Sequence, residues 1–185
     1  MKGNRIGLII LVTAVLVSPV FAQESGFVSR EGRFSIALPA ETHGLKPLAV
    51  DSPLGTLSGN AYEWKMKEGT YTVGFVDAPN SIEDAENSGR ILGSIRERMT
   101  AWATSKNGKV ISDKPSEIDK HPGLELKLEF PNALLWQRFY VVSNRLYQVI
   151  LVLKADQRPG EAEALKVLDS FKILSDPAKA AMIRS

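Results

Sequence analysis

The pattern of apolar positions is strongest between Leu134 and Leu174, and it predicts the centre of the fold. Two runs rich in β-branched and aromatic residues flank the polar turn Ser143–Arg145, which indicates a β-hairpin. Both faces of this hairpin are apolar, so we expect it to lie inside a sheet that is covered on both sides. An amphipathic helix is predicted after Pro159–Gly160, and its inward residues are Ala164, Leu165, Leu168 and Phe171.

Alternation assigns the residues of this hairpin to its two faces, because successive side chains of a strand point to opposite sides. One face is predicted to carry Phe139, Val141, Ile150 and Val152. The opposite face is predicted to carry Trp136, Tyr140, Val142, Tyr147 and Val149.

The N-terminal part predicts one strand and one hairpin. Arg33–Leu38 alternates with period two, after a short leader over 23–30 and before a loop over 40–53. The runs 54–67 and 70–76 predict a hairpin with Glu68–Gly69 as its two-residue turn. That turn places Met66 opposite Tyr71, Trp64 opposite Val73 and Tyr62 opposite Phe75.

A long helix and two further strands are predicted in the middle of the chain. The helix covers 81–107, begins at a cap formed by Asn80 or Ser81, and ends at Asn107–Gly108. Its inward stripe is Ile91, Leu92, Ile95, Met99, Trp102 and Ala103. An edge strand over 109–118, a turn over 119–123 and a strand over 124–130 follow, and Glu125, Lys127 and Glu129 are assigned to the solvated face of the last strand.

The order of these elements is β, ββ, α, β, β, ββ, α, and neighbouring strands are joined by tight turns. This order predicts an α+β fold in which two helices cover a largely antiparallel sheet, as an α/β/α sandwich. We expect one domain over 23–174 and a C-terminal tail over 175–185.

Residues 1–22 have the layout of a secretory signal peptide. A basic start with Lys2 and Arg5 precedes an apolar run, and Val20–Ala22 supplies small residues at a cleavage site before Gln23. The run is short for a membrane-spanning helix, so an uncleaved anchor is the less favoured alternative. Cleavage predicts a periplasmic or secreted protein without a membrane span, and it lowers Lys plus Arg from 23 to 21, equal to the 21 Asp plus Glu. A chain of balanced charge has no electrostatic basis for binding nucleic acid.

The chain offers little that resembles catalytic or metal-binding chemistry. It has no cysteine, and its two histidines, His43 and His121, lie in loops with Gly and Pro and are interpreted as turn residues. Glu125 and Glu129 could act as a carboxylate pair, but a solvated sheet face is the favoured interpretation. We therefore predict no catalytic residues, no metal site and no cofactor.

Arg138 is the residue of the apolar hairpin that needs an explanation, because a half-buried arginine requires a partner. It can stack on an aromatic ring, pair with an internal carboxylate or bind a ligand, and internal pairing is favoured. Trp136, Arg138 and Tyr140 share a face and are the candidate binding residues.

Several segments resemble the PsbP-like superfamily, whose fold is the Mog-type α/β/α sandwich. They are Phe34–Pro39, Asp51–Thr56, the long middle helix, and the closing stretch 138–174, within which Asn144–Tyr147 and Asp169–Phe171 are the most specific. The superfamily includes many small exported bacterial proteins without an assigned function. The resemblance implies a non-enzymatic accessory or binding domain.

Three functions follow as hypotheses. The first is an exported, non-enzymatic accessory domain that binds another protein or a component of the cell envelope. The second is a small-molecule carrier with a pocket between sheet and helix, lined by Trp64, Tyr71 and Trp136. The third and least favoured is an enzyme that uses carboxylates or Arg138.

Overall fold

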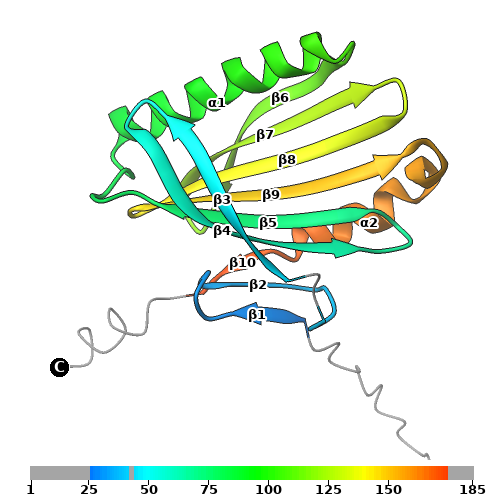
Figure 1. Cartoon of the computed structure of the whole chain (residues 1–185), viewed down its shortest axis with the longest axis horizontal. Coiled ribbons are helices and arrows are strands. Elements are labelled where there is room, and N and C mark those ends of the chain that lie inside the picture. The colour runs from blue at the N-terminus through cyan, green and yellow to red at the C-terminus, as the bar shows by residue number, and fades with distance from the viewer. Residues whose placement is uncertain (1–25, 42–43, 175–185) are drawn as a thin grey trace, which may run out of the picture.

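The computed structural model describes residues 26–41 and 44–174, which form two β-sheets and two α-helices (Figure 1). The main sheet is antiparallel and has seven strands in the order β3-β4-β5-β9-β8-β7-β6. Their bounds, in that order, are Leu45–Ser52, Gly55–Lys65, Thr70–Asp77, Arg145–Lys154, Ala133–Val142, His121–Phe130 and Lys109–Ile118. A small sheet pairs β1 (Phe27–Ser29), β2 (Phe34–Ile36) and β10 (Lys172–Ile173) in the order β1-β2-β10.

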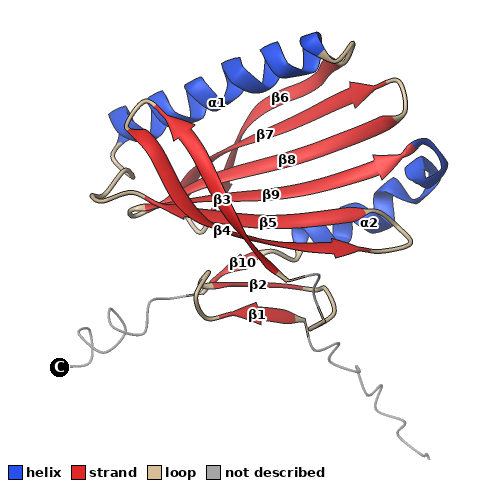
Figure 2. Cartoon of the chain, in the orientation of Figure 1, coloured by secondary structure: helices blue, strands red, loops and turns tan. Residues whose placement is uncertain are grey.

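The helices lie on opposite sides of the main sheet, as Figure 2 shows. Helix α1 (Ala85–Ser105) covers one face; the small sheet and α2 (Glu161–Asp169), which follows the 3₁₀ helix η1 (Ala155–Gly160), cover the other. The predicted α+β fold with a covered antiparallel sheet is therefore confirmed. Neither helix within the described residues is both long and apolar enough to cross a membrane.

The hairpin β8–β9 occupies the middle of the main sheet, as its pattern predicts, and both of its faces are buried. Towards α1 the faces contribute Leu135, Phe139, Val141, Leu146, Ile150 and Val152. Towards α2 and the small sheet they contribute Leu134, Trp136, Tyr140, Val142, Tyr147, Val149, Leu151 and Leu153. The predicted division of the hairpin into two apolar faces is confirmed.

Two segments for which no strand is predicted each contain one. The leader 23–30 contains β1, which is only three residues long and therefore too short to show a period-two pattern. The loop 40–53 contains β3, although Pro47 lies within it. Proline lacks a backbone N–H donor, and β3 tolerates it because β3 is an edge strand.

The β4–β5 hairpin differs from its predicted register by two residues. Its central turn is Lys67–Glu68, because the Met66 amide donates to the Gly69 carbonyl oxygen at 2.9 Å. Trp64 consequently faces Tyr71 instead of Val73. A shift by two keeps every side chain on its original face, so the predicted apolar face survives the change in register.

Helix α1 begins later than predicted. Its N-cap is Asp84, whose carboxylate accepts from the Asn87 amide at 2.9 Å, and neither Asn80 nor Ser81 caps it. The residues just before the helix bind the β8–β9 turn instead: the Ala78 amide donates to the Asn144 oxygen at 2.7 Å. Tertiary hydrogen bonds thus outweigh the local capping preference.

The far end of α1 matches one prediction and contradicts another. Asn107 has φ 56°, and the Gly108 amide donates to the Ala103 oxygen at 2.8 Å, so the predicted stop at Asn107–Gly108 is confirmed. Trp102, by contrast, does not join the inward stripe and is 42% exposed. It lies beside Phe130, with 5.0 Å between the ring centroids.

The remaining turns are tighter than the sequence suggested. The strand over 109–118 is the edge strand β6, as predicted. The turn after it contains only Asp119 and Lys120, both at positive φ, so 121–123 already belongs to β7. In the β8–β9 turn, Ser143 takes the positive φ, at 58°.

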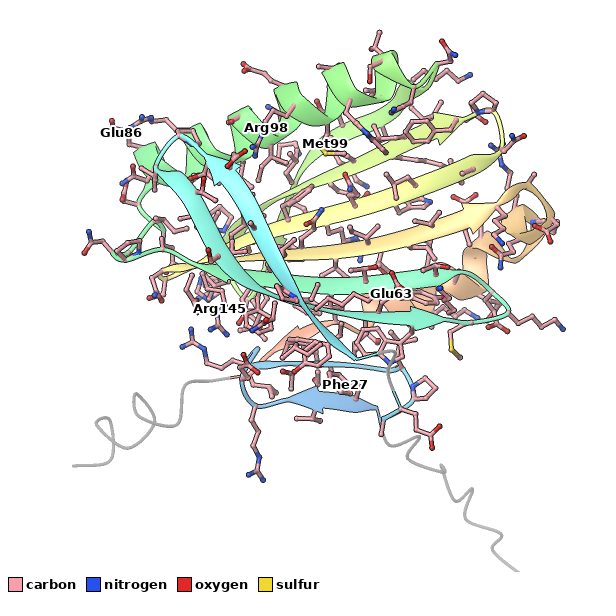
Figure 3. All side chains as sticks on the ribbon, in the orientation of Figure 1. Phe27, Glu63, Glu86, Arg98, Met99 and Arg145 are labelled. Atoms are coloured by element: carbon pink, nitrogen blue, oxygen red, sulfur yellow. The ribbon has the colours of Figure 1, made fainter. Side chains whose placement is uncertain are left out.

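Arg145 joins the main sheet to the segment between β1 and β2 (Figure 3). Its guanidinium donates to both carboxylate oxygens of Asp77 at 2.6 and 2.7 Å and to the Glu31 carbonyl oxygen at 2.8 Å. The same group lies over the ring of Phe75, 4.6 Å from its centroid. Tyr147 adds a hydrogen bond from its hydroxyl to the Gly32 oxygen at 2.8 Å.

We predict that Arg145→Met lowers the free energy of unfolding by about 1.5–3 kcal/mol, because the hydrogen bonds of its buried guanidinium to the half-exposed Asp77 and to the Glu31 oxygen are lost. Urea unfolding of residues 23–185 measures the change. Arg96→Met is the matched control: its pair with Asp113 is exposed and should contribute less than about 1 kcal/mol. Equal losses in the two variants would contradict the assigned role of Arg145.

Candidate functional site

The predicted binding residues lie on the face of β8 that is turned towards α2. Arg138 and Tyr140 line a cleft of about 380 Å³ between β6, β8 and the end of α2, which we call the Arg138 cleft. Trp136 does not line it, because its indole N–H donates to Glu161 at 2.7 Å and Lys127 lies 4.7 Å above its ring. The structure thus brings two of the three residues to one cleft.

Arg138 is paired inside the protein. Its Nε donates to Glu125 and a terminal nitrogen lies against Asp169, each at 2.7 Å. Burial acts to lower the pKa of Arg138, and the hydrogen bonds to Asp169 and Glu125 outweigh burial and raise it. The favoured interpretation, internal pairing, is therefore what the structure shows, while a binding role for Trp136, Arg138 and Tyr140 stays a prediction.

The sequence predicts that Glu125 lies on a solvated face, and this prediction is wrong. Glu125 is only 5% exposed. It faces Arg138 across β7–β8 and Lys114 across β6–β7, and its contact to Lys114 measures 3.0 Å. Burial acts to raise the pKa of Glu125, but the hydrogen bonds from Lys114 and Arg138 hold it below its usual value. A signal for this pair was present in the sequence, because a two-residue turn at Pro131–Asn132 places residue 138 opposite residue 125.

The chemistry of the Arg138 cleft follows from this pairing. A carboxyl with a lowered pKa is ionised at neutral pH, so Glu125 is poorly suited to donate a proton. Tyr140 stacks on Phe171, with 6.1 Å between the ring centroids. Within 26–41 and 44–174, no three His, Cys, Asp or Glu residues are grouped to hold a metal ion. Four of the charged residues that line the cleft, Lys114, Glu125, Arg138 and Asp169, compensate one another.

His121 is the first residue of β7 and contacts the carboxylate of Glu83 through Nδ1. The same carboxylate accepts from the Ser143 backbone amide at 2.7 Å. Glu83 thereby joins the segment before α1 to the start of β7 and to the β8–β9 turn. His43 lies outside the described residues, as do the predicted signal peptide and the C-terminal tail.

The three aromatic residues predicted to line a carrier pocket lie on the same face of the main sheet, where Trp64 is opposite Tyr71, but they do not line one cleft together. Trp64 is 2% exposed and donates through its indole N–H to the Pro39 oxygen at 3.0 Å. Tyr71 lines a second cleft, of about 780 Å³, which we call the Tyr71 cleft. Its lining residues are Gly26, Ala37, Leu38, Pro39, Met66, Glu68, Tyr71, Gly160, Glu163 and Val167.

Sequence reasoning missed a surface at the C-terminal end of α1. There the exposed Trp102 lies against Phe130, which lines a shallow cleft of about 380 Å³. The Trp102 surface, as we call it, comprises Trp102 and the residues of that cleft, Asn107, Gly108, Lys109, Glu129, Phe130, Pro131 and Arg158. The sequence does not predict this surface, because Trp102 falls at the helical spacing of the buried stripe of α1 and burial is therefore expected for it.

Comparison with known proteins supports the fold. No protein-family model matches the chain, and no curated protein does. Among solved structures, the chain is similar to the solution structure of cyanobacterial PsbP (CyanoP) from Synechocystis sp. PCC 6803, with a TM-score of 0.52 and 11% sequence identity. The match covers 85% of this chain and 98% of CyanoP. At this identity the similarity shows a PsbP-like fold and carries no information on activity.

The most specific segments of the resemblance have structural roles in this chain. In the segment 144–147, Arg145 and Tyr147 bind the backbone between β1 and β2. In the segment 169–171, the Ser170 hydroxyl accepts from the Ala37 amide at 2.8 Å, and Phe171 packs against Phe34. These residues attach the small sheet to the main sheet.

We predict that Glu125→Gln lowers stability at neutral pH and that its difference from wild type shrinks in acid. The folded pKa of Glu125 is depressed, so its stabilising contribution is present above the unfolded pKa and is lost as pH falls through the folded pKa. Urea unfolding between about pH 7 and pH 3 measures the difference, spanning the usual pKa of a glutamate. A difference independent of pH would contradict the assigned ion pairing.

Proposed function

We propose that this chain is an exported, non-enzymatic accessory domain that binds another protein of the cell envelope. The layout of residues 1–22 supports export. The mutual pairing of Lys114, Glu125, Arg138 and Asp169 supports a role without catalysis, because these charges are committed to one another. The PsbP-like fold is consistent with the proposal without deciding it.

Trp102 is the observation that carries the proposal. A tryptophan that is 42% exposed leaves a large apolar area in water, and tryptophan is among the residues that contribute most to protein interfaces. It stands beside a cleft that can receive one side chain of a partner. Ile111, on the edge strand β6 two residues beyond Lys109, is also 46% exposed.

The charges of the Trp102 surface indicate the chemistry of the partner. Lys109 and Arg158 both pair with the single carboxylate of Glu129, at 2.9 and 2.8 Å. Lys106, which follows the last turn of α1 and is exposed, adds a third cation. Positive charge therefore exceeds negative charge around Trp102, and we infer a partner that presents an acidic residue beside an apolar one.

Site-specific photo-crosslinking tests this proposal. A photoreactive residue is placed at Lys106 in residues 23–185, and at Val28 in a matched control. Val28 is 57% exposed but lies on β1, outside the Trp102 surface. In a native envelope extract we expect position 106 to give one dominant crosslinked protein, which is then purified.

We predict that Trp102→Ala weakens direct binding of that purified protein by about 10- to 30-fold, the effect of removing an interface tryptophan. Isothermal titration calorimetry measures the affinity, and Val28→Ala should bind like wild type. Higher salt should weaken the interaction, because exposed charges are screened. Unchanged binding by Trp102→Ala, or equal crosslinking from positions 28 and 106, would overturn the proposal.

A further inference from the structure

The Tyr71 cleft has the size and the position of a small-molecule site. Its volume of about 780 Å³ falls within the usual range for ligand pockets, roughly 300–1,000 Å³. It opens between the end of the β4–β5 hairpin, the segment 37–39 after β2, and α2. It shares no residue with the Trp102 surface or the Arg138 cleft, so a ligand bound there is independent of both.

Most residues that line the cleft are apolar, so we expect the larger part of a ligand to be apolar as well. Leu38, Pro39, Met66 and Val167 present carbon or sulfur atoms to the cleft. Met66 adds a flexible thioether chain that adapts to the shape of its contacts. The polar groups that could orient a ligand are Tyr71, Glu68 and Glu163.

These polar groups favour a ligand that donates hydrogen bonds. The Tyr71 side chain is only 1% exposed and its hydroxyl donates to the Ala164 oxygen at 3.4 Å, so its lone pairs can accept a hydrogen bond only from a group that reaches it through the cleft. Burial and the nearby charge of Glu68 raise the pKa of Tyr71 to about 12, so the hydroxyl stays neutral at physiological pH. Carboxylates are acceptors as well.

The net charge at the cleft is negative. Glu163 is compensated by Lys166, whose Nζ lies 2.7 Å from its carboxylate. Glu68 has no ion-pair partner among the described residues, and it lies near enough to Tyr71 to influence its pKa. The cleft thus combines an apolar wall, a neutral phenol acceptor and one uncompensated carboxylate.

We propose that the Tyr71 cleft binds a small apolar amine, with its ammonium group between the Glu68 carboxylate and the Tyr71 hydroxyl and its apolar body against Leu38, Met66 and Val167. This adds small-molecule binding, the second function considered from the sequence, to the proposed accessory role. Since the site is separate from Trp102, either proposal can fail without the other.

Three probes of the same shape and different charge test the proposal. They are 1-naphthylmethylamine, 1-naphthylmethanol and 1-naphthoate, each titrated into residues 23–185 and followed by amide chemical shifts. We expect the amine to bind about 10-fold or more tightly than the alcohol, and the naphthoate most weakly, because the cleft repels an anion. The shifts should concentrate in Met66–Tyr71 and Gly160–Val167.

Two variants separate charge from shape. Glu68→Gln should bring the affinity for the amine down to that for the alcohol and leave the affinity for the alcohol unchanged, since only the charge is removed. Glu97→Gln on α1, also exposed but outside the cleft, should retain the preference for the amine. Tyr71→Phe should weaken binding of the amine by several-fold through loss of one acceptor.

Several results would overturn the proposal. Equal affinities for the amine and the alcohol, shifts centred on other residues, or an unchanged amine preference in Glu68→Gln would each refute the assigned chemistry. So would the absence of any binding up to about 10 mM, which is about ten times the dissociation constant of a weak, 1 mM ligand.

Discussion

The hairpin β8–β9 has no polar face, and the rest of the structure follows from that constraint. A strand buried on both sides requires a cover on each, and two separate apolar clusters meet this need. Helix α1 covers one side. On the other side α2 is short, and the small sheet completes the cover. Full burial of a large apolar side chain contributes about 1.5–3 kcal/mol, so neither cover is dispensable.

Phe171 shows how the second cover is fixed. Its ring lies 5.6 Å from Phe34 of the small sheet and 5.7 Å from Tyr147 of β9, between ring centroids. The hydroxyl of Tyr147 and the guanidinium of Arg145 then bind the backbone of the segment that joins β1 to β2. The two most specific segments of the sequence resemblance, 144–147 and 169–171, thus attach the small sheet to the core.

The sequence predicted the features that depend on long periodic runs. The faces of β8–β9, the buried face of β2 and the edge position of β6 all follow from alternation or from a proline, which act locally. Strands β1 and β3 escaped prediction because one is three residues long and the other contains Pro47. Burial of Glu125 and exposure of Trp102 depend on which neighbours arrive from elsewhere in the chain, and single-strand patterns do not specify that.

The candidate sites divide by how their charges are compensated. In the Arg138 cleft, Lys114, Glu125, Arg138 and Asp169 are paired with one another, which is the arrangement expected of charges that hold strands together. At the Trp102 surface and the Tyr71 cleft, apolar area and uncompensated charge remain exposed, and such features are typical of binding sites. Arg138, which stands out in the sequence, therefore has a structural role. Trp102 and Glu68, which do not stand out, carry the proposed functions.

The most direct test of this division is the affinity of the Arg138→Met variant for the partner captured at position 106, set beside its free energy of unfolding. The structure predicts a loss of about 2–4 kcal/mol in stability, because Glu125 loses a buried partner, and an affinity equal to that of wild type. A variant of full stability with a large loss of affinity would contradict the account and return Trp136, Arg138 and Tyr140 to the role of a binding site.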